Sequence, residues 1–449
     1  MMTAGVTTVT LIAPKSNNKT ASELSILTTP LTGILLLATM LRDKGYEVQC
    51  YDESFYTPHY ERITTDYVLI SSMSATVNRA YELADYFTSQ NIPVFMGGLH
   101  ASFQPQETLE HCDKVVIGEG EHVLFDLFNK KNTNTIIQGT PVMDLNTLPL
   151  PDYQLVQGMS KHPKVISVCS SRGCPFKCKF CSLKSMFGQT FRYIDNEKII
   201  HHLQQFSSIK NLCFDEPNFT ADKQRAIRLL QEMKDHGIFP KYAWPSVSID
   251  VANNKKLLQL CSDVADFHFL IGLESVNEQV LKGYNKKHTP QQMRKAIDTI
   301  HDYGIKIQGS FIFGSDHDDP SVVQQTVDFC HDAEVDFPGF FPLTPYVGTE
   351  IRQELEQQQR IFSNNWDVYD GAHVVFHPKH MTAYELQQGV IDAFEGFYSS
   401  KKILHHLFDG DVFYSVQTFL FRMLIERVIH TNKDYLAFLE KESRKKSVG

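Results

Sequence analysis

The segment KVISVCSSRGCPFKCKFCSLKSMFG, residues 164–188, places Cys174, Cys178 and Cys181 within eight positions of one another. It begins with an apolar run that predicts a strand and continues into a polar loop that carries glycine and lysine residues. Thiols at such short spacing, directly after a strand, indicate ligands for a metal ion or a metal cluster.

Three interpretations of these cysteines are open from their chemistry alone. Buried cysteines are often packing residues, but three of them in one polar loop fit that interpretation poorly. A structural zinc ion takes four protein ligands; no second Cys/His pair follows at zinc-finger spacing, and Cys169 lies inside the predicted strand. A cluster of four irons held by three thiolates leaves one iron open to a substrate or cofactor, which is a catalytic arrangement.

The rest of the chain forms two series of alternating strands and helices. In the first, the apolar segments 7–14, 46–52, 66–74, 92–98 and 113–121 alternate with helical patterns, which predicts a doubly wound, Rossmann-like parallel sheet. In the second, six strand–helix units beginning at residue 164 predict a partial (β/α)6 barrel of the TIM type, with its chemistry at the strand carboxyl ends. We therefore expect an α/β protein with a first domain at 1–140, a proline-bearing linker at 141–164, a barrel at 165–382 and a helical C-terminal region at 383–449.

The composition narrows the classes of protein further. A chain of 449 residues predicts two or three domains, and its net charge of −9 argues against nucleic acid as a partner. No basic region precedes the first apolar segment, and no apolar run approaches the ~20 residues of a membrane span. Nine cysteines are too sparse for a disulfide scaffold, so we expect a reducing, cytoplasmic setting.

The pattern CxxxCxxC after the first strand of a predicted barrel resembles the radical S-adenosylmethionine (SAM) superfamily, in which an aromatic residue, here Phe180, precedes the last cysteine. Three further segments carry the resemblance: FDEPNF (214–219), IGLESVNEQVL (271–281) and GSFIFG (309–314). The resemblance implies that Cys174, Cys178 and Cys181 hold a [4Fe–4S] cluster and that SAM binds beside Phe180, Asp215, Glu274 and Gly314. Two of these residues have simpler alternatives, because Asp215 could be a helix N-cap and Glu274 a salt bridge at the barrel rim.

The first domain resembles the cobalamin-binding module of one subgroup of that superfamily, and TPYVGTE (344–350) resembles a loop common in the same branch. Its matching segments are SSMSAT (71–76), GGLHASFQP (97–105) and GEGE (118–121). They imply a cobalamin site at Ser72, Ser74, Gly97, Gly98, Gly118 and Glu119. Small residues at strand ends can also simply form tight turns. The loop at 13–30 lacks the histidine that binds cobalt in related mutases, so cobalamin either binds without it or has been lost.

The C-terminal region offers weaker signals. The apolar helix predicted at 411–430 is either buried or helps to cover a lipid-like substrate through Phe413, Phe419, Leu420 and Phe421. We assign no metal to His405 and His406, which are adjacent in the sequence and lie on opposite sides of any metal-binding face. The remaining cysteines form no second compact set, so we expect no auxiliary cluster.

The expected function is cobalamin-dependent methylation of an unactivated carbon through a 5′-deoxyadenosyl radical. The alternative is a radical SAM cyclisation, carbon–carbon coupling or rearrangement with a vestigial cobalamin domain. A protein that holds zinc or a cluster without turnover is the rival from another class. The expected partners are a small-molecule or lipid substrate and an electron donor of the flavodoxin or ferredoxin type; nucleic acid is not expected, and membrane contact is disfavoured.

Overall fold

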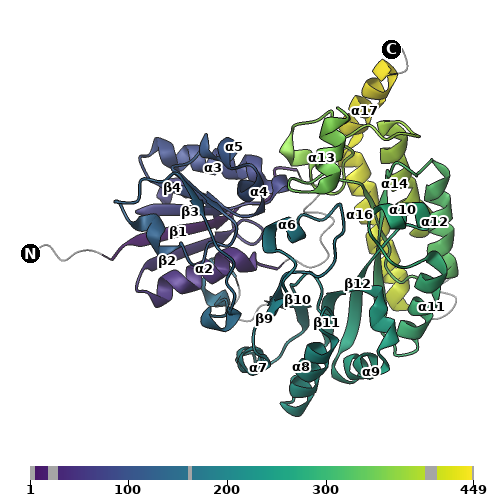
Figure 1. The fold of residues 1–449 in the computed structure, drawn as a ribbon, viewed down its shortest axis with the longest axis horizontal. Helices are drawn as coiled ribbons and strands as arrows, with labels where there is room; N and C mark the ends of the chain where they lie inside the picture. Colours follow the sequence, from purple (N-terminus) through teal and green to yellow (C-terminus); the bar gives the residue numbers. More distant parts are fainter. Residues whose placement is uncertain (1–5, 19–28, 160–163, 400–411, 447–449) are drawn as a thin grey trace, which may run out of the picture.

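The computed structural model describes residues 6–18, 29–159, 164–399 and 412–446. In this part of the chain, two parallel six-stranded sheets are joined by a linker and followed by C-terminal helices. The short helix α6 (Leu183–Phe187) lies between the two sheets (Figure 1). The expected α/β architecture, a doubly wound first domain ahead of a partial six-stranded barrel, is confirmed.

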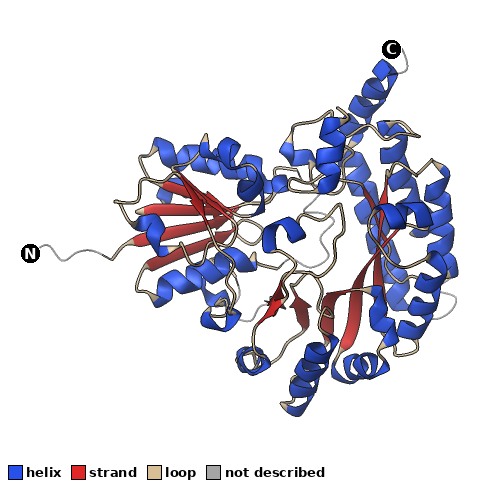
Figure 2. Ribbon diagram, viewed as in Figure 1, coloured by secondary structure: helices blue, strands red, loops and turns tan. Residues whose placement is uncertain are grey.

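The first sheet has the strand order β2-β1-β3-β4-β5-β6, with every pair parallel. Its strands are β1 (Thr8–Ala13), β2 (Glu47–Asp52), β3 (Tyr67–Ser71), β4 (Val94–Gly97), β5 (Lys114–Ile117) and β6 (Ile136–Gln138), and its helices are α2 (Thr32–Asp43), α3 (Val77–Ser89), α4 (Leu99–Phe103) and α5 (Pro105–Leu109). Helices cover both faces of this sheet (Figure 2), with α2 and α3 packed into separate apolar cores. Because the chain order reverses between β1 and β3, a ligand crevice is expected at the carboxyl ends of those two strands.

The second sheet runs in the order β14-β13-β12-β11-β10-β7, again fully parallel. Its strands are β7 (Val165–Val168), β10 (Asn211–Phe214), β11 (Tyr242–Val247), β12 (Asp266–Glu274), β13 (Lys306–Phe313) and β14 (Gly339–Pro342). The surrounding helices are α7 (Asn196–Leu203), α8 (Lys223–Asp235), α9 (Lys255–Val264), α10 (Glu278–Gly283), α11 (Pro290–His301), α12 (Ser321–Asp332) and α13 (Glu350–Gln357). Buried and half-buried residues alternate along β11 and β13, as expected when one side of a strand faces helices and the other faces an open barrel lumen.

The linker is more ordered than its proline content predicts. It contains the 3₁₀ turns η4 (Leu145–Thr147) and η5 (Tyr153–Leu155), and its Val156 forms a parallel bridge with Cys50 beside β2. Val142, Leu145 and Leu148 pack into the barrel core, whereas Tyr153 and Val156 pack into a core of the first domain. The linker therefore connects the two cores through its own apolar side chains. We keep the domain limits given above as a proposal.

The C-terminal helices are α14 (Ala383–Phe397), α16 (Val412–Thr431) and α17 (Lys433–Lys446). Helix α14 packs on β14, and α16 and α17 pack on α14. Phe421 is half-buried and stacks on Tyr398 at 5.0 Å, whereas Phe419 and Leu420 are about half exposed, so these side chains do not converge. His405 and His406 lie outside the described residues, as does the side chain of Phe413. Among the described helices, none combines the length and apolarity needed to cross a bilayer.

Candidate active site between the two domains

The cysteine loop follows β7 and is framed by a small antiparallel hairpin, β8 (Ser171–Arg172) and β9 (Arg192–Tyr193). Gly173 turns the chain from β8 into the loop with φ +87°. A Cβ atom at Gly173 would lie 2.2 Å from the carbonyl oxygen of Thr190, so only glycine fits there. The hairpin thus fixes the direction in which the chain enters Cys174.

The thiols of Cys174, Cys178 and Cys181 are half-buried, unpaired by disulfides and close enough to influence one another. Burial raises the pKa of each thiol above its ordinary value, and a neighbouring cysteine raises each pKa further. The ammonium of Lys286 acts in the opposite direction on the pKa of all three.

The thiols of Cys174, Cys178 and Cys181 lie close together, since each raises the pKa of another. In the described residues, no three His, Cys, Asp or Glu side chains form a ready group of ligands for one metal ion. A zinc ion would hold its thiolates roughly 2.3 Å from a common centre, whereas a cubane binds each thiolate at a different iron. Three thiolates would fill three corners of a cubane, whereas a structural zinc site would need a fourth protein ligand.

Lys286 is the residue that sequence reasoning missed. Its Nζ lies 2.8 Å from Glu274 Oε1 and 3.2 Å from the carbonyl oxygen of Gly272, and 5.9 Å from the centre of the Phe180 ring. Burial alone would lower the pKa of Lys286, but the Glu274 carboxylate and the thiols of Cys178 and Cys181 outweigh it and raise that pKa. No sequence pattern distinguishes this inward lysine from its exposed neighbour Lys287.

Glu274 occupies a strained position at the carboxyl end of β12. Its φ is +68°, rare for a residue with a side chain, and the strand register shifts between Gly272 and Glu274. A Cβ atom on Gly272 would come within 2.1 Å of Glu274 Oε1. The salt bridge considered for Glu274 is therefore present, with Lys286, and the carboxylate is held close to the cysteine loop.

Asp215 and Gly314 lie at the carboxyl ends of β10 and β13. Asp215 is exposed and accepts a hydrogen bond of 3.0 Å from Thr32 of α2, in the first domain. The N-cap of α8 is Asp222, so the capping role considered for Asp215 is wrong. Gly314 has φ +100° and donates its N–H to Asp318. Asp318, also missed from the sequence, is buried with one oxygen unpartnered in the described structure, and burial raises its pKa to about 7.

At the edge of the first sheet, the small residues form a preshaped surface. A Cβ atom on Gly98, which has φ +94°, would lie 2.6 Å from the carbonyl oxygen of Ser72, so this glycine serves the contact with its neighbouring strand. Ser74 Oγ lies 3.2 Å from Nδ1 of the buried His100. Ser72 Oγ, by contrast, is buried and has no hydrogen-bond partner in the described residues, so it is available to bond a ligand. Gly97 has only ordinary contacts.

Gly118 and Glu119 follow β5. Gly118 has φ +80° and donates its N–H to Ser102 Oγ at 3.0 Å. Glu119 is buried, with both carboxylate oxygens on arginines of the β8–β9 hairpin. The structure thus places the GEGE segment at the boundary with the cysteine loop.

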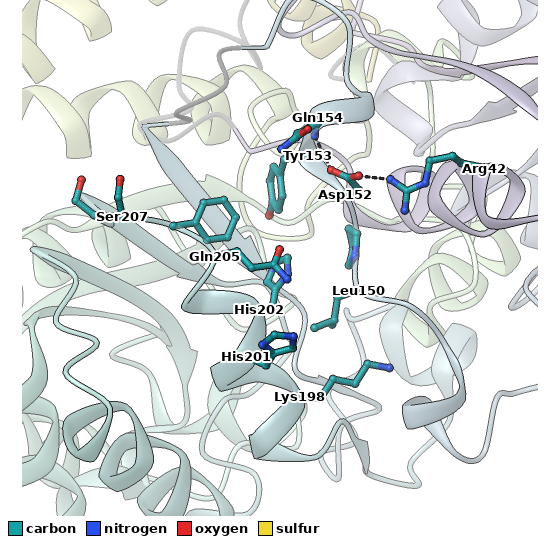
Figure 3. Close-up of a pocket in the computed structure, with 13 residues that line it drawn as sticks. Arg42, Leu150, Asp152, Tyr153, Gln154, Lys198, His201, His202, Gln205 and Ser207 are labelled. Atoms are coloured by element: carbon teal, nitrogen blue, oxygen red, sulfur yellow. Dashed lines mark hydrogen bonds and ion pairs between the residues drawn. The ribbon is translucent and has the colours of Figure 1, made fainter.

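A cavity of ≈ 930 Å³ lies elsewhere between the domains, lined by α2, the linker and α7 (Figure 3). Arg42 and Asp152 form an ion pair across it, and burial lowers the pKa of His202 to about 4. None of the residues predicted for the site lines this cavity. The chemistry expected at the cysteines is therefore separate from it.

Comparison with known families agrees with this geometry. Residues 168–330 match the model of the Radical SAM superfamily, and residues 27–128 match that of the B12 binding domain. The chain carries a radical SAM domain behind a B12-binding domain. Its cofactors are accordingly a [4Fe–4S] cluster, SAM and cobalamin, which suit the three free thiols and the unpartnered Ser72 hydroxyl.

Relatives share this organisation. The chain is 27% identical over 412 residues to the bacteriochlorophyllide d C-12(1)-methyltransferase of Chlorobaculum tepidum, with 88% of each chain covered. It is 28% identical over 388 residues to the bacteriochlorophyllide d C-8(2)-methyltransferase of that organism, covering 82% of this chain and 85% of the relative. The solved cobalamin-dependent SAM radical enzyme OxsB, with aqua-cobalamin and SAM bound, has a TM-score of 0.68 at 14% identity, covering 99% of this chain and 80% of OxsB, a likeness of fold.

Proposed function

We propose that this chain is a cobalamin-dependent radical SAM methyltransferase that methylates an unactivated carbon. The observation that carries the proposal is the placement of the cysteine loop against the carboxyl edge of the B12-binding sheet. Side chains join the two domains on more than one side of this boundary, through Thr32 and Asp215 and through Trp366, whose indole N–H donates to Glu107 at 2.7 Å. Two cofactor sites that face each other suit a reaction that needs both.

In this proposal Cys174, Cys178 and Cys181 hold the cluster at three corners. Lys286 and Glu274, close to these thiols, would present one positive and one negative charge to a ligand bound there. A methionine moiety carries one carboxylate and one ammonium group, so the pair offers each its opposite charge. Gly314 and Asp318 serve the nucleoside end, because Asp318 keeps an unpartnered buried oxygen there.

When bound, the cofactors supply a carbon-centred radical and a methyl group. The chain's own residues bind the cofactors, orient the substrate and exclude water from the site. The alternate half-buried positions of β11 and β13 would line the barrel lumen and surround the substrate. The unpartnered hydroxyl of Ser72 would donate or accept a hydrogen bond to a corrin tail bound at the edge of the B12-binding domain.

The partners remain part of the proposal. The relatives named above act on bacteriochlorophyllides, large and mostly apolar rings, so we propose an apolar small molecule or lipid as the first substrate class to screen. The exposed tip of the cysteine loop, with Phe176 and Lys177, suits approach by an acidic one-electron carrier of the flavodoxin or ferredoxin type. A reducing, cytoplasmic setting is part of the proposal, because nine cysteines are too sparse in this chain for a disulfide scaffold.

The test is anaerobic reconstitution of the full chain. We expect roughly four irons and four sulfides per chain, corrin absorbance after growth with hydroxocobalamin, and reductant-dependent 5′-deoxyadenosine. Replacing Cys174, Cys178 or Cys181 with alanine should abolish the iron and the nucleoside, whereas the buried Cys261→Ala control should keep both. Transfer of labelled methyl from SAM to a component of cell extract identifies the reaction. Full iron content in the three alanine variants would overturn the ligand assignment, and protein without corrin absorbance would overturn the cobalamin part.

A further inference from the structure

A buried network of four charges joins the B12-binding domain to the cysteine loop. Glu119 and Glu121 follow β5 of the first domain, and Arg172 and Arg192 face each other across the β8–β9 hairpin. Their side chains are between 2% and 14% exposed. Two arginines opposite each other on a hairpin would repel, so the two glutamates from the other domain complete this part of the fold.

Glu119 is the centre of the network. Arg192 donates to both of its oxygens, at 2.5 and 3.0 Å, and Arg172 donates to Oε2 at 2.8 Å. The backbone N–H of Val142, in the linker, donates to the same oxygen at 3.1 Å. Glu121 accepts one bond, of 2.6 Å, from the other guanidinium nitrogen of Arg172. Burial would raise the pKa of Glu119, but the two arginines outweigh it, so the carboxylate stays charged.

The backbone around Glu119 is shaped to deliver this side chain across the boundary. Gly118 turns the chain with φ +80°. A Cβ atom on Gly139 would lie 2.0 Å from the carbonyl oxygen of Glu119, so the chain leaving β6 approaches closely enough to require glycine there. The carboxylate is thus aimed at the hairpin, and its two oxygens are fully used by it.

The network fastens both ends of the cysteine loop. Arg172 lies two residues before Cys174, with only Gly173 between them. Arg192 also donates to the carbonyl oxygens of Phe187 at 3.3 Å and Val142 at 2.7 Å, and Phe187 is the last residue of α6, just after the third cysteine. Arginines at both ends of the cysteine loop, Arg172 and Arg192, therefore bind the same carboxylate, that of Glu119.

We infer that Glu119 is a positioning residue that sets the place of the cluster relative to the B12-binding domain. Buried ion pairs contribute little net stability to a fold. Moving one partner away leaves the other charge buried and uncompensated, so such a pair holds its two segments in one geometry. A radical formed at one cofactor must reach a substrate that also meets the other, so the spacing of the two sites matters for the reaction. The inference rests on the proposed function only in this last step.

The first test needs no cobalamin. In cluster-loaded Glu119→Gln, amide hydrogen exchange in residues 170–193 should be at least about tenfold faster than in the wild type, with exchange in α3 unchanged. Glu121→Gln, which loses one bond to Arg172, should show a smaller increase confined to the entrance of the loop. The matched control is Glu53→Gln: Glu53 is a buried carboxylate on Arg79, at 2.8 Å, wholly within the first domain. Unchanged exchange in 170–193 for Glu119→Gln, or an equal increase in the control, would overturn the inference.

The second test measures the spacing itself. In protein reduced to hold both the [4Fe–4S]⁺ cluster and cob(II)alamin, pulsed electron paramagnetic resonance should give one narrow distance between the two centres in the wild type. Glu119→Gln should broaden it, and Arg192→Lys, which keeps the charge but loses the two-pronged contact, should broaden it less. A narrow, unshifted distance in Glu119→Gln contradicts the inference. Absence of any cob(II)alamin signal in the wild type instead contradicts the proposed function, and hydrogen exchange still decides the role of Glu119.

Discussion

The carboxyl edge of the B12-binding sheet and that of the barrel differ in the kind of contacts that their polar side chains make. At the part of the B12-binding edge that follows β3 and β4, Ser74 contacts His100 and Gly98 fits against Ser72, so this surface is set by close packing and neutral hydrogen bonds. At the barrel edge, three thiols with raised pKa values share one cation, Lys286, which is itself paired with Glu274. The first edge is suited to recognise a large ligand by shape, and the second to recognise a small ligand by charge. Substitutions that disturb shape should therefore act on the first edge, and those that disturb charge on the second.

The largest effect is expected from Gly98→Ala. The new methyl group would meet the Ser72 backbone at 2.6 Å in a backbone conformation that alanine rarely adopts, which costs about 2–4 kcal/mol in the free energy of unfolding. The Gly98→Ala variant should also retain less corrin than the wild type, whereas its iron content should be unchanged. Denaturant unfolding and corrin absorbance measure the two effects. Gly33→Ala, with nothing within 4 Å in helix α2, is the control and should be neutral or stabilise by up to about 1 kcal/mol. Equal behaviour of the two variants would remove the shape argument.

Lys286→Met should weaken SAM binding to the cluster-loaded protein by about 10- to 100-fold, because a charged hydrogen bond to the ligand is lost. The formation of 5′-deoxyadenosine should fall in parallel, with corrin retention unchanged. Equilibrium dialysis of labelled SAM measures the affinity. The exposed neighbour provides the matched variant, Lys287→Met, which should bind SAM as the wild type does. Wild-type affinity in Lys286→Met would show that the charge pair serves only the fold.

Cluster assembly should strengthen as pH rises. The pKa of each thiol is raised in the folded protein, so the protonated form persists at neutral pH, and iron binding must release those protons. Apparent iron affinity should therefore increase between pH 7 and 9 by up to about tenfold per unit for each proton released. Because Lys286 lowers all three pKa values, Lys286→Met should move this dependence to higher pH. Competition with an iron chelator measures it; a flat profile would contradict the raised pKa values.

The smallest effect should come from Ser72→Ala. Removing a buried hydroxyl that has no partner should leave the unfolding free energy unchanged or raise it by about 1 kcal/mol, while cobalamin release becomes up to about tenfold faster. Ser74→Ala should instead lower the free energy of unfolding by about 1 kcal/mol, because the hydrogen bond to His100 is lost. Corrin dissociation rates and denaturant midpoints separate the two serines. Identical results would mean that Ser72 does not face the ligand.

Much of this fold could be predicted because strand and helix periodicity repeat regularly along the chain. The cysteine loop could be predicted because its thiols follow a strand at short spacing, whereas Glu274 and the glycines were predicted from the family resemblance of their segments. Lys286 and Arg192 could not be found in this way, since their inward direction depends on loops and on partners in another part of the chain. Glu119 was predicted as a residue of the cobalamin site, and that role stays a prediction; its partners Arg172 and Arg192 lie 53 and 73 residues away, a separation that no local pattern spans. Asp215 resembles a cap by sequence, yet the helix begins later, at Asp222.

The linker has a consequence for exchanging modules between such proteins. Val142, Leu145 and Leu148 belong to the core of the barrel, whereas Tyr153 and Val156 belong to a core of the first domain. A gene divided between these two groups of residues would therefore remove apolar side chains from the cores of both products. Chimeras made at this point should aggregate, whereas a transplanted first domain that keeps residues 139–157 together with matched contact residues of the recipient should stay monodisperse. Recombination in this lineage is therefore expected to move the two halves as one block.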